Sequence, residues 1–386
     1  MATQTEVPTR YYSKLISTIK QGESAVIDLG HLRFKVAKHF GLCFGVSNAI
    51  KTAYQAIAEN EGRRIFLLSE IIHNPIVNQD LQSEGLRFLF SPEGEQLIPF
   101  SALHADDVVI IPAFGATLEL LHELEQAHVK VRLYDTTCPF VVRVWKTAER
   151  MCRDGFTVIV HGKPNHEETK ATFSRCRAAG AALIVSGLQA AKSLCAYIVG
   201  DLSEELFEVE FSGVCSDGFK PARDLSKLGV VNQTTMPATE TVKISHILRE
   251  ALAQRYGASE IESRFFDTSG TLCLATDQNQ ASLQALLESG GDLVLIVGGY
   301  NSSNTAHLAA MSRAKLPTYH IEDADEIIDL DTIRHYDALA QSVVISRSWF
   351  PQDVKRPEIL ISAGASCPDS VVEEVLNKIK ELGATP

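Results

Sequence analysis

Short, uninterrupted apolar segments alternate with amphipathic segments along the whole chain. The apolar segments that predict strands include residues 65–68, 108–111, 157–160, 182–185, 228–231, 293–297 and 358–361. Continuous rather than alternating apolar runs are typical of parallel strands that are buried on both faces. Each run is followed by a turn and then a helical pattern, such as residues 118–127 or 371–382. This repetition predicts an α/β fold with parallel sheets.

Three of the eight cysteines share one local setting, the end of a predicted strand just before a predicted helix. They are Cys43, Cys138 and Cys273, and the helices are expected over 46–57, over 140–151 and from about Gln280. A thiol at a helix start lies near free backbone N–H groups and the positive end of the helix dipole, which favour the thiolate. Three such thiolates could hold an iron–sulfur cluster that keeps one iron without a protein ligand. The other five cysteines have no such setting apart from Cys367, which lies beside a polar turn; without a C-x-x-C pair, we expect all five to be structural.

The charge balance limits the classes of partner. The chain has 386 residues, with 36 Lys+Arg against 48 Asp+Glu and a formal net charge of −12. This excess of acid argues against nucleic acid or an anionic membrane as the main partner. No apolar run approaches the roughly 18 residues of a transmembrane helix, and the first residues lack the apolar core of a secretory signal. We therefore expect a cytoplasmic protein with reduced thiols.

The expected architecture is three similar α/β units with parallel sheets, arranged in a trefoil-like way around a central cluster site. We expect an N-terminal extension over 1–33 with one modest helix, followed by units over 34–137, 138–267 and 268–386, the last including the C-terminal segment. Residues 201–227 are charged and poorly periodic, which indicates a helical insertion or surface loop in the second unit.

Polar turns follow several of these strands, at the carboxyl ends where α/β proteins gather their binding groups. The turns over 298–305 (GGYNSSNT) and 362–369 (SAGASCPD) combine Gly with Ser or Asn just before a helix, as anion sites do. The same residues also serve as ordinary N-caps, so one such turn alone would not indicate a ligand. Two of them, with His73 and His166 on other turns, favour a phosphate or diphosphate ligand.

A second kind of turn could move protons. His166 and Glu168 share the loop after residues 157–160, and an imidazole and a carboxylate together can pass a proton to a leaving group. Thr234, after residues 228–231, has a hydroxyl suited to orienting a bound alcohol or water. The alternative for each is a solvated polar turn, and neither motif is strong by itself.

With these turns assembled, the chain resembles the 4-hydroxy-3-methylbut-2-enyl diphosphate reductase (IspH/LytB) family from about residue 34 to residue 382. The motifs that match in order are GLCFGV, EIIHNP, PAFGA, DTTCP, HGKPNHEET, NQTTM, CLAT, GGYNSSNT and AGASCPD. The residues within these motifs are most similar to those of the cyanobacterial and plastid branch.

The resemblance implies a site and a reaction. Cys43, Cys138 and Cys273 would be the ligands of a [4Fe–4S] cluster with an open apical iron. Glu168 would supply protons, assisted by Thr234 and His166, and Thr234 would lie near the substrate hydroxyl. The implied substrate-binding residues are His73, His166, Thr234, Ser302, Ser303, Asn304 and Ser366. The implied reaction is reductive dehydroxylation of the diphosphate substrate to isopentenyl and dimethylallyl diphosphate, the last step of the non-mevalonate pathway, with a ferredoxin or flavodoxin as electron donor.

Two positions depart from the common family pattern. Phe114 occupies the place of a pocket histidine in many bacterial members, although the cyanobacterial and plastid branch shares the PAFGA wording. The stretch from Thr268 to Cys273 is about three residues longer than the usual T-I-C. The position of Cys273 is therefore the one that most needs a structure.

Two other functions stay open at this point. A three-cysteine cluster lyase or condensing enzyme resembling quinolinate synthase would use a similar plan but would need no external electrons. An iron–sulfur redox sensor is disfavoured by the net charge and by the lack of a recognisable nucleic-acid-binding motif. Neither G-x-G-x-x-G nor the P-loop motif occurs, which disfavours a plain nucleotide-binding protein.

Overall fold

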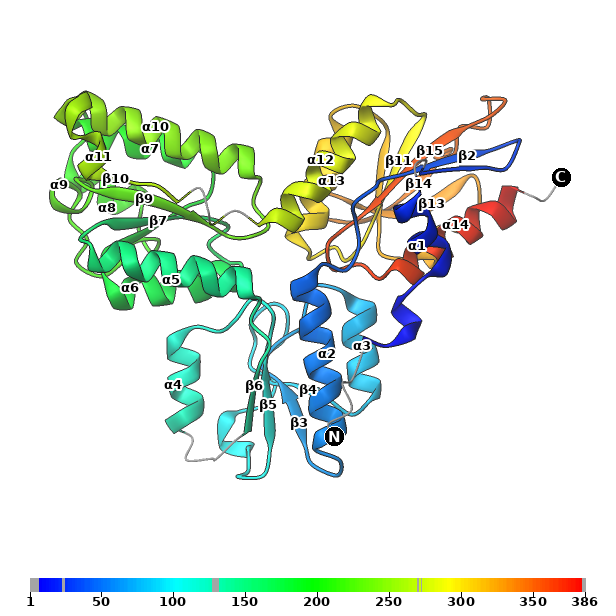
Figure 1. The fold of residues 1–386 in the computed structure, drawn as a ribbon, viewed down its shortest axis with the longest axis horizontal. Coiled ribbons are helices and arrows are strands. Elements are labelled where there is room, and N and C mark those ends of the chain that lie inside the picture. The colour runs from blue at the N-terminus through cyan, green and yellow to red at the C-terminus, as the bar shows by residue number, and fades with distance from the viewer. Residues whose placement is uncertain (1–6, 23–24, 127–131, 269–270, 272, 384–386) are drawn as a thin grey trace. The chain divides into compact units, whose positions relative to one another are not determined.

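Both ends of the chain fold into the same unit of this computed structural model, which describes residues 7–22, 25–126, 132–268, 271 and 273–383 (Figure 1). Unit 1 contains Met1–Gly62, Glu70–Arg87 and Leu274–Pro386, and unit 2 contains Arg63–Ser69 and Phe88–Cys273. The predicted three-unit boundaries stay a prediction. None of the described helices is both long and apolar enough to cross a membrane.

Unit 1 is built on a five-stranded sheet in the order β1-β2-β15-β11-β12. The β1–β2 pair is antiparallel and the other pairs are parallel. The strands of unit 1 are β1 (Val26–Asp28), β2 (Arg33–Val36), β11 (Leu293–Val297), β12 (Thr318–Ile321), β13 (Thr332–Asp337), β14 (Ser342–Arg347) and β15 (Glu358–Ala363). Its helices are α1 (Lys14–Gln21), α2 (Phe44–Glu59), α3 (Pro75–Ser83), α12 (Leu274–Glu288), α13 (Ser303–Arg313) and α14 (Asp369–Gly383). Apolar side chains from the sheet, α12, α13 and α14 pack into one core cluster of this unit.

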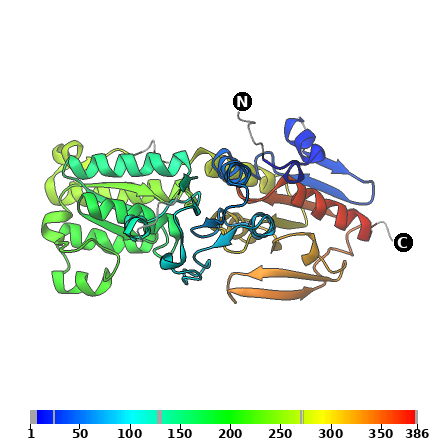
Figure 2. The ribbon, with the colours of Figure 1, turned by 90° about the horizontal axis from the view of Figure 1, so that it is seen from below.

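The sequence did not predict three features of unit 1. Strand β1 adds to the sheet edge, and Tyr11 and Ile16 are buried, so the N-terminal segment is part of the fold rather than a polar extension. Strands β13 and β14 form an antiparallel hairpin, drawn in orange apart from the main sheet in Figure 2. Helix α12 begins at Leu274, directly after Cys273, rather than near Gln280.

Unit 2 contains two four-stranded sheets, in the orders β10-β9-β7-β8 and β4-β3-β5-β6, and strand β4 (Arg87–Phe88) lies at the division between the units. The other strands are β3 (Ile65–Leu67), β5 (Val108–Ile111), β6 (Arg132–Asp135), β7 (Thr157–His161), β8 (Ala182–Val185), β9 (Leu228–Asn232) and β10 (Phe265–Phe266). The helices are α4 (Leu118–Gln126), α5 (Pro139–Arg153), α6 (Glu167–Ala179), α7 (Leu188–Val199), α8 (Glu204–Glu210), α9 (Pro221–Asp224), α10 (Ala238–Tyr256) and α11 (Ile261–Arg264). Helices α5 and α6 cover one face of the first sheet, and α7 and α10 cover the other (Figure 1). The pairs of that sheet are parallel, as the continuous apolar runs predicted.

The segment over residues 201–227 is more than an insertion on the surface. It forms the short helices α8 and α9, and it buries the three aromatic rings of Phe207, Phe211 and Phe219 in the core beneath α7. The ring of Phe207 stacks on that of Phe219 at 5.3 Å between centroids. Its aromatic residues explain why a charged, aperiodic stretch nevertheless packs.

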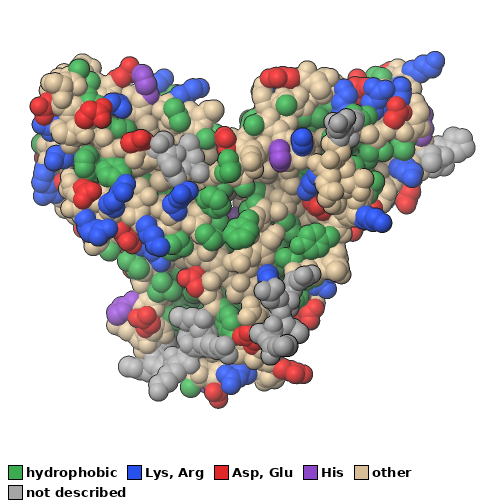
Figure 3. Space-filling model, in the orientation of Figure 1, with side chains coloured by type: hydrophobic (Ala, Val, Ile, Leu, Met, Phe, Trp, Pro, Cys, Tyr) green, Lys and Arg blue, Asp and Glu red, His purple; other side chains and the backbone are tan. Residues whose placement is uncertain are grey.

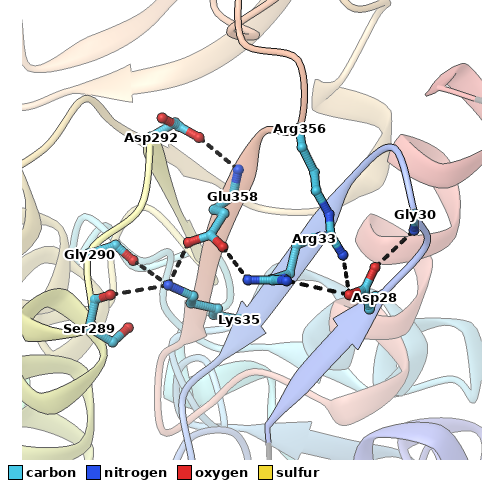
Figure 4. A network of polar contacts seen from close by, with 9 residues as sticks. All are labelled: Asp28, Gly30, Arg33, Lys35, Ser289, Gly290, Asp292, Arg356 and Glu358. Atoms are coloured by element: carbon cyan, nitrogen blue, oxygen red, sulfur yellow. Dashed lines mark hydrogen bonds and ion pairs between the residues drawn. The ribbon is translucent and has the colours of Figure 1, made fainter.

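A network of charged side chains lies at the end of the unit 1 sheet where β2 and β15 begin and β1 ends (Figure 4). Glu358, at the start of β15, pairs with Arg33 and with Lys35 at 2.6 Å each. Asp28 joins the network through Arg33 and Arg356, and the hydrogen bond from Arg356 lowers the pKa of Asp28 to about 2. These ion pairs lie at the sheet end opposite the polar turns, so their role is structural.

Candidate active site

The anion-type turn after β11 leaves buried donors without protein partners. Ser302 caps α13, and its Oγ accepts a hydrogen bond from Thr305 N at 3.3 Å. Ser303 Oγ, Asn304 Nδ2 and Thr305 Oγ1 are buried and have no hydrogen-bond partner among the described residues. A buried donor without a partner costs free energy, so these groups at a helix N-terminus suit an anion that would accept from them.

The turn after β15 is tied to the turn after β11. Asn304 Oδ1 accepts a hydrogen bond from Ala365 N at 2.9 Å. Gly364 allows this approach, because a Cβ at that position would lie 2.1 Å from Thr305 Oγ1. Cys43, the N-cap residue of α2, donates from its backbone N to Ala365 O at 3.1 Å. The structure therefore brings Cys43 together with Asn304 and the turn that contains Ser366.

His73 lies on the same group of turns and is held by a buried acid. Ser366 Oγ donates to His73 O at 3.1 Å. Glu70 Oε2 lies 3.2 Å from His73 Nδ1, and it accepts a hydrogen bond from Asn301 Nδ2 at 2.7 Å. The exposed fraction of Glu70 is only 8%. A buried carboxylate with two such contacts fixes both the imidazole and the asparagine.

Two further side chains, those of His320 and Glu322, contact the backbone of the turn after β11. His320 is buried, and its Nε2 lies 2.9 Å from Gly298 O, a contact in which the carbonyl accepts. Burial lowers the pKa of His320 to about 4, so the ring is neutral at physiological pH. Glu322 accepts a hydrogen bond from Tyr300 N at 3.0 Å, and burial raises the pKa of this carboxyl. Neither residue was singled out from the sequence.

Unit 2 holds the predicted proton-transfer residues in one cluster. Glu168 is in the first turn of α6, and its exposed fraction is 4%. Its carboxylate oxygens accept from both Thr234 N at 2.6 Å and Thr234 Oγ1 at 2.8 Å. His166 is the N-cap of α6, and its Nδ1 accepts from Glu168 N at 3.2 Å, which puts the proton of a neutral ring on Nε2. Glu168 and Thr234, which the sequence singled out separately, are thus in direct contact in the structure.

Cys138 lies next to this cluster along a short chain of contacts. It is the N-cap residue of α5, and its N donates to Ala113 O at 2.8 Å. The neighbouring Phe114 packs edge-on against the ring of His166, with centroids 6.4 Å apart. Phe114 therefore supports the imidazole by packing, in a place where a histidine could have offered a polar contact.

The cysteines fall into two groups. Cys43, Cys138 and Cys273 are partly exposed, and α12 begins directly after Cys273. Burial raises the pKa of the other five thiols, which belong to Cys152, Cys176, Cys195, Cys215 and Cys367. The raised pKa is about 11 for Cys152 and for Cys195. A raised pKa keeps these thiols protonated, which suits a structural role. Within the described ranges, no group of three or more His, Cys, Asp or Glu side chains is placed to hold a metal ion. Of the longer stretch before Cys273, Ser269, Gly270 and Leu272 lie outside the described residues.

Polar turns at the carboxyl ends of parallel strands, with an anion-type helix start and a buried acid, are the arrangement that α/β enzymes use for anionic substrates. The family model described as LytB protein matches residues 34–380. The chain belongs to the LytB family.

Curated relatives cover nearly the whole chain. A protein of Gloeobacter violaceus named 4-hydroxy-3-methylbut-2-enyl diphosphate reductase is 37% identical over 382 residues, which is 98% of this chain and 89% of the relative. A protein of Thermosynechococcus vestitus with the same name is 39% identical over 374 residues, which is 96% of this chain and 90% of the relative.

Solved structures agree on the fold. A structure of (E)-4-hydroxy-3-methyl-but-2-enyl diphosphate reductase, titled the terminal enzyme of the non-mevalonate pathway, is 27% identical with a TM-score of 0.51 and covers 90% of this chain and 98% of its own. The E-1-hydroxy-2-methyl-but-2-enyl-4-diphosphate reductase from Plasmodium falciparum has a TM-score of 0.63 at 19% identity and covers 92% of this chain and 88% of its own. The second likeness concerns the fold alone.

Proposed function

We propose that this protein is a reductase of 4-hydroxy-3-methylbut-2-enyl diphosphate. The reaction removes the allylic hydroxyl as water, consumes two electrons and two protons, and gives isopentenyl or dimethylallyl diphosphate. Besides the family, the observation that supports this function most is the set of buried donors without partners at the start of α13, namely Ser303 Oγ and Asn304 Nδ2. These groups match the oxygens of a diphosphate.

The first task of the protein is to hold the diphosphate. Ser302, Ser303 and Asn304 would bind it at the N-terminus of α13, with Ser366 and His73 on the adjoining turns of the same unit. Fixing the diphosphate also fixes the position of the allylic alcohol, which lowers the entropic part of the barrier.

The second task is proton delivery. In its protonated form, Glu168 would give its proton to the leaving hydroxyl oxygen, which then departs as water and leaves Glu168 as a carboxylate. Thr234 holds the carboxyl in one orientation through its backbone N and its Oγ1, and its hydroxyl could turn toward a substrate hydroxyl. His166, with its ring proton on Nε2, would serve as a further donor to the substrate.

The donor set fits an iron–sulfur cluster. Cys43 and Cys138 are the N-cap residues of α2 and α5, and Cys273 directly precedes α12, so all three thiols lie at helix starts, where a thiolate is favoured. We propose that these three hold a [4Fe–4S] cluster, which when bound would supply the electrons and an open Lewis-acidic iron. The proposed electron donor is a reduced ferredoxin or flavodoxin, and we retain the expectation of a cytoplasmic protein that needs neither nucleic acid nor membrane.

A pair of cysteine variants tests this function. We expect Cys138→Ser, purified without oxygen, to lose most of its iron, its acid-labile sulfide and its turnover of the hydroxylated diphosphate with a chemically reduced dye. Cys152→Ser is the matched control, since its thiol is in the apolar core of unit 2 and should leave all three unchanged. Full iron content in Cys138→Ser would refute the ligand set. Turnover without any reductant would instead favour the lyase alternative.

A further inference from the structure

Four basic residues form a row along one side of α5, which we call the α5 basic stripe: Arg143, Lys146, Arg150 and Arg153. All four are exposed. The other side of the helix buries Val144, Ala148 and Met151 in the core of unit 2. Several Lys and Arg side chains gather over this part of unit 2 on the left of Figure 3.

The stability of α5 does not explain this row. Consecutive members are three or four positions apart, where like charges repel and destabilise a helix. The helix dipole favours cations only in the last turn of α5. That turn contains Arg150 and Arg153 but not Arg143 or Lys146. Among the described residues, no ion pair within 4.0 Å involves any of the four, although Glu149 lies on the same helix. Arg150 lies over the Phe266 ring, 4.8 Å from its centroid, so its position has a partly structural explanation, which Arg143 and Lys146 lack.

The stripe lines a hollow that begins beside a proposed cluster ligand. An open depression of about 740 Å³ is lined by the stripe together with Thr137, Pro139, Val142 and Thr147. Thr137 immediately precedes Cys138, the N-cap of α5. Arg143 is five residues further on, which is roughly 7.5 Å along the helix axis.

We propose that the α5 basic stripe is the docking surface for an acidic ferredoxin. This inference rests on the proposed function, which requires two electrons per turnover, delivered by two single-electron carriers in succession. With a net charge of −12, the chain as a whole repels an acidic carrier, whereas a basic stripe that no described carboxylate neutralises through an ion pair attracts it locally and orients it. A carrier bound over the first half of the stripe has its redox centre close to the helix start that contains Cys138.

The test neutralises the first half of the stripe in the cluster-loaded enzyme. In Arg143→Gln/Lys146→Gln, we expect the KM for reduced ferredoxin to rise about tenfold and to depend less steeply on salt concentration, as for charges at an interface rim. Turnover with a small reduced dye should stay within twofold of the unchanged protein, because a dye needs no docking surface.

The control is Lys192→Gln/Lys243→Gln, which makes the same charge change at exposed positions of α7 and α10, on the other face of the same sheet. It should leave the KM for ferredoxin unchanged. An unchanged KM in the stripe variant, or an equal rise in the control, would overturn the docking proposal. If the stripe variant raised the KM for flavodoxin but not the KM for ferredoxin, the choice of ferredoxin as the partner would be overturned. Dye-driven turnover reports the reductase activity separately, so the two proposals fail in distinguishable ways.

Discussion

At the scale of single residues, Glu168 and Thr234 act as one group. Both oxygens of the carboxyl accept hydrogen bonds from the same threonine, and the acid is almost fully buried. The sequence identified both residues, but only the structure shows that they are partners, since 66 positions separate them.

We expect Glu168→Gln to reduce kcat by about 100-fold or more, in the range of a lost general acid, while the KM for the diphosphate changes less than threefold. The iron content should be unchanged. Thr234→Val should also reduce kcat, and the double variant should be little worse than Glu168→Gln alone, because both act through one carboxyl. Steady-state kinetics of the three variants would measure this, and independent, multiplying effects would contradict the shared role.

At the scale of elements, hydrogen bonds join the turns after β11 and β15 to each other and to the turn over residues 70–74. Glu70 joins Asn301 across 231 positions of sequence, and Ser366 joins the carbonyl of His73 across 293. The sequence predicted the anion-binding character of these turns from their residue types. It gave no role to Glu70 or Asn301, because nothing local indicates that a carboxylate and an amide so far apart will meet.

The role of Glu70 as a positioning residue is testable through substrate binding. We expect Glu70→Ala to raise the KM for the diphosphate about tenfold, because His73 and Asn301 lose the group that orients them, with a smaller effect on kcat. Asn301→Ala should act in the same direction but more weakly. Substrate titration at constant cluster content checks both variants. A loss confined to kcat would contradict the positioning role.

At the scale of the whole molecule, the two ends of the unit 1 sheet have separate tasks. The carboxyl ends of the strands bear the polar turns, and the amino ends are closed by the charged network of Glu358, Lys35 and Arg33 (Figure 4). The hydrogen bond from Lys35 is the main cause of the lowered pKa of Glu358. This network should therefore govern acid stability without affecting catalysis.

Glu358 should make the free energy of unfolding decrease as the pH falls. Because the pKa of Glu358 is lower in the folded state, its stabilisation is present above the unfolded pKa of about 4.3 and is lost as the pH falls through the folded value. We expect Glu358→Gln to lower the free energy of unfolding at pH 7 by about 1 kcal/mol and to flatten its decline below pH 5. Denaturant unfolding between pH 3 and pH 7 measures this, with Glu61→Gln as an exposed control. Equal pH profiles for all three proteins would refute the role of the network.

The sequence by itself determined the α/β class, the strands with continuous apolar runs and the residue types of the site, because these depend on local periodicity and turn chemistry. Tertiary structure decided what depends on distant contacts. It placed β1 at a sheet edge, set the start of α12 at Leu274, and packed the aromatic residues of the 201–227 segment into a core. It also paired Glu168 with Thr234 and Glu70 with Asn301. A hydrogen bond between residues far apart in sequence depends on where the fold brings them, and no local pattern records that position.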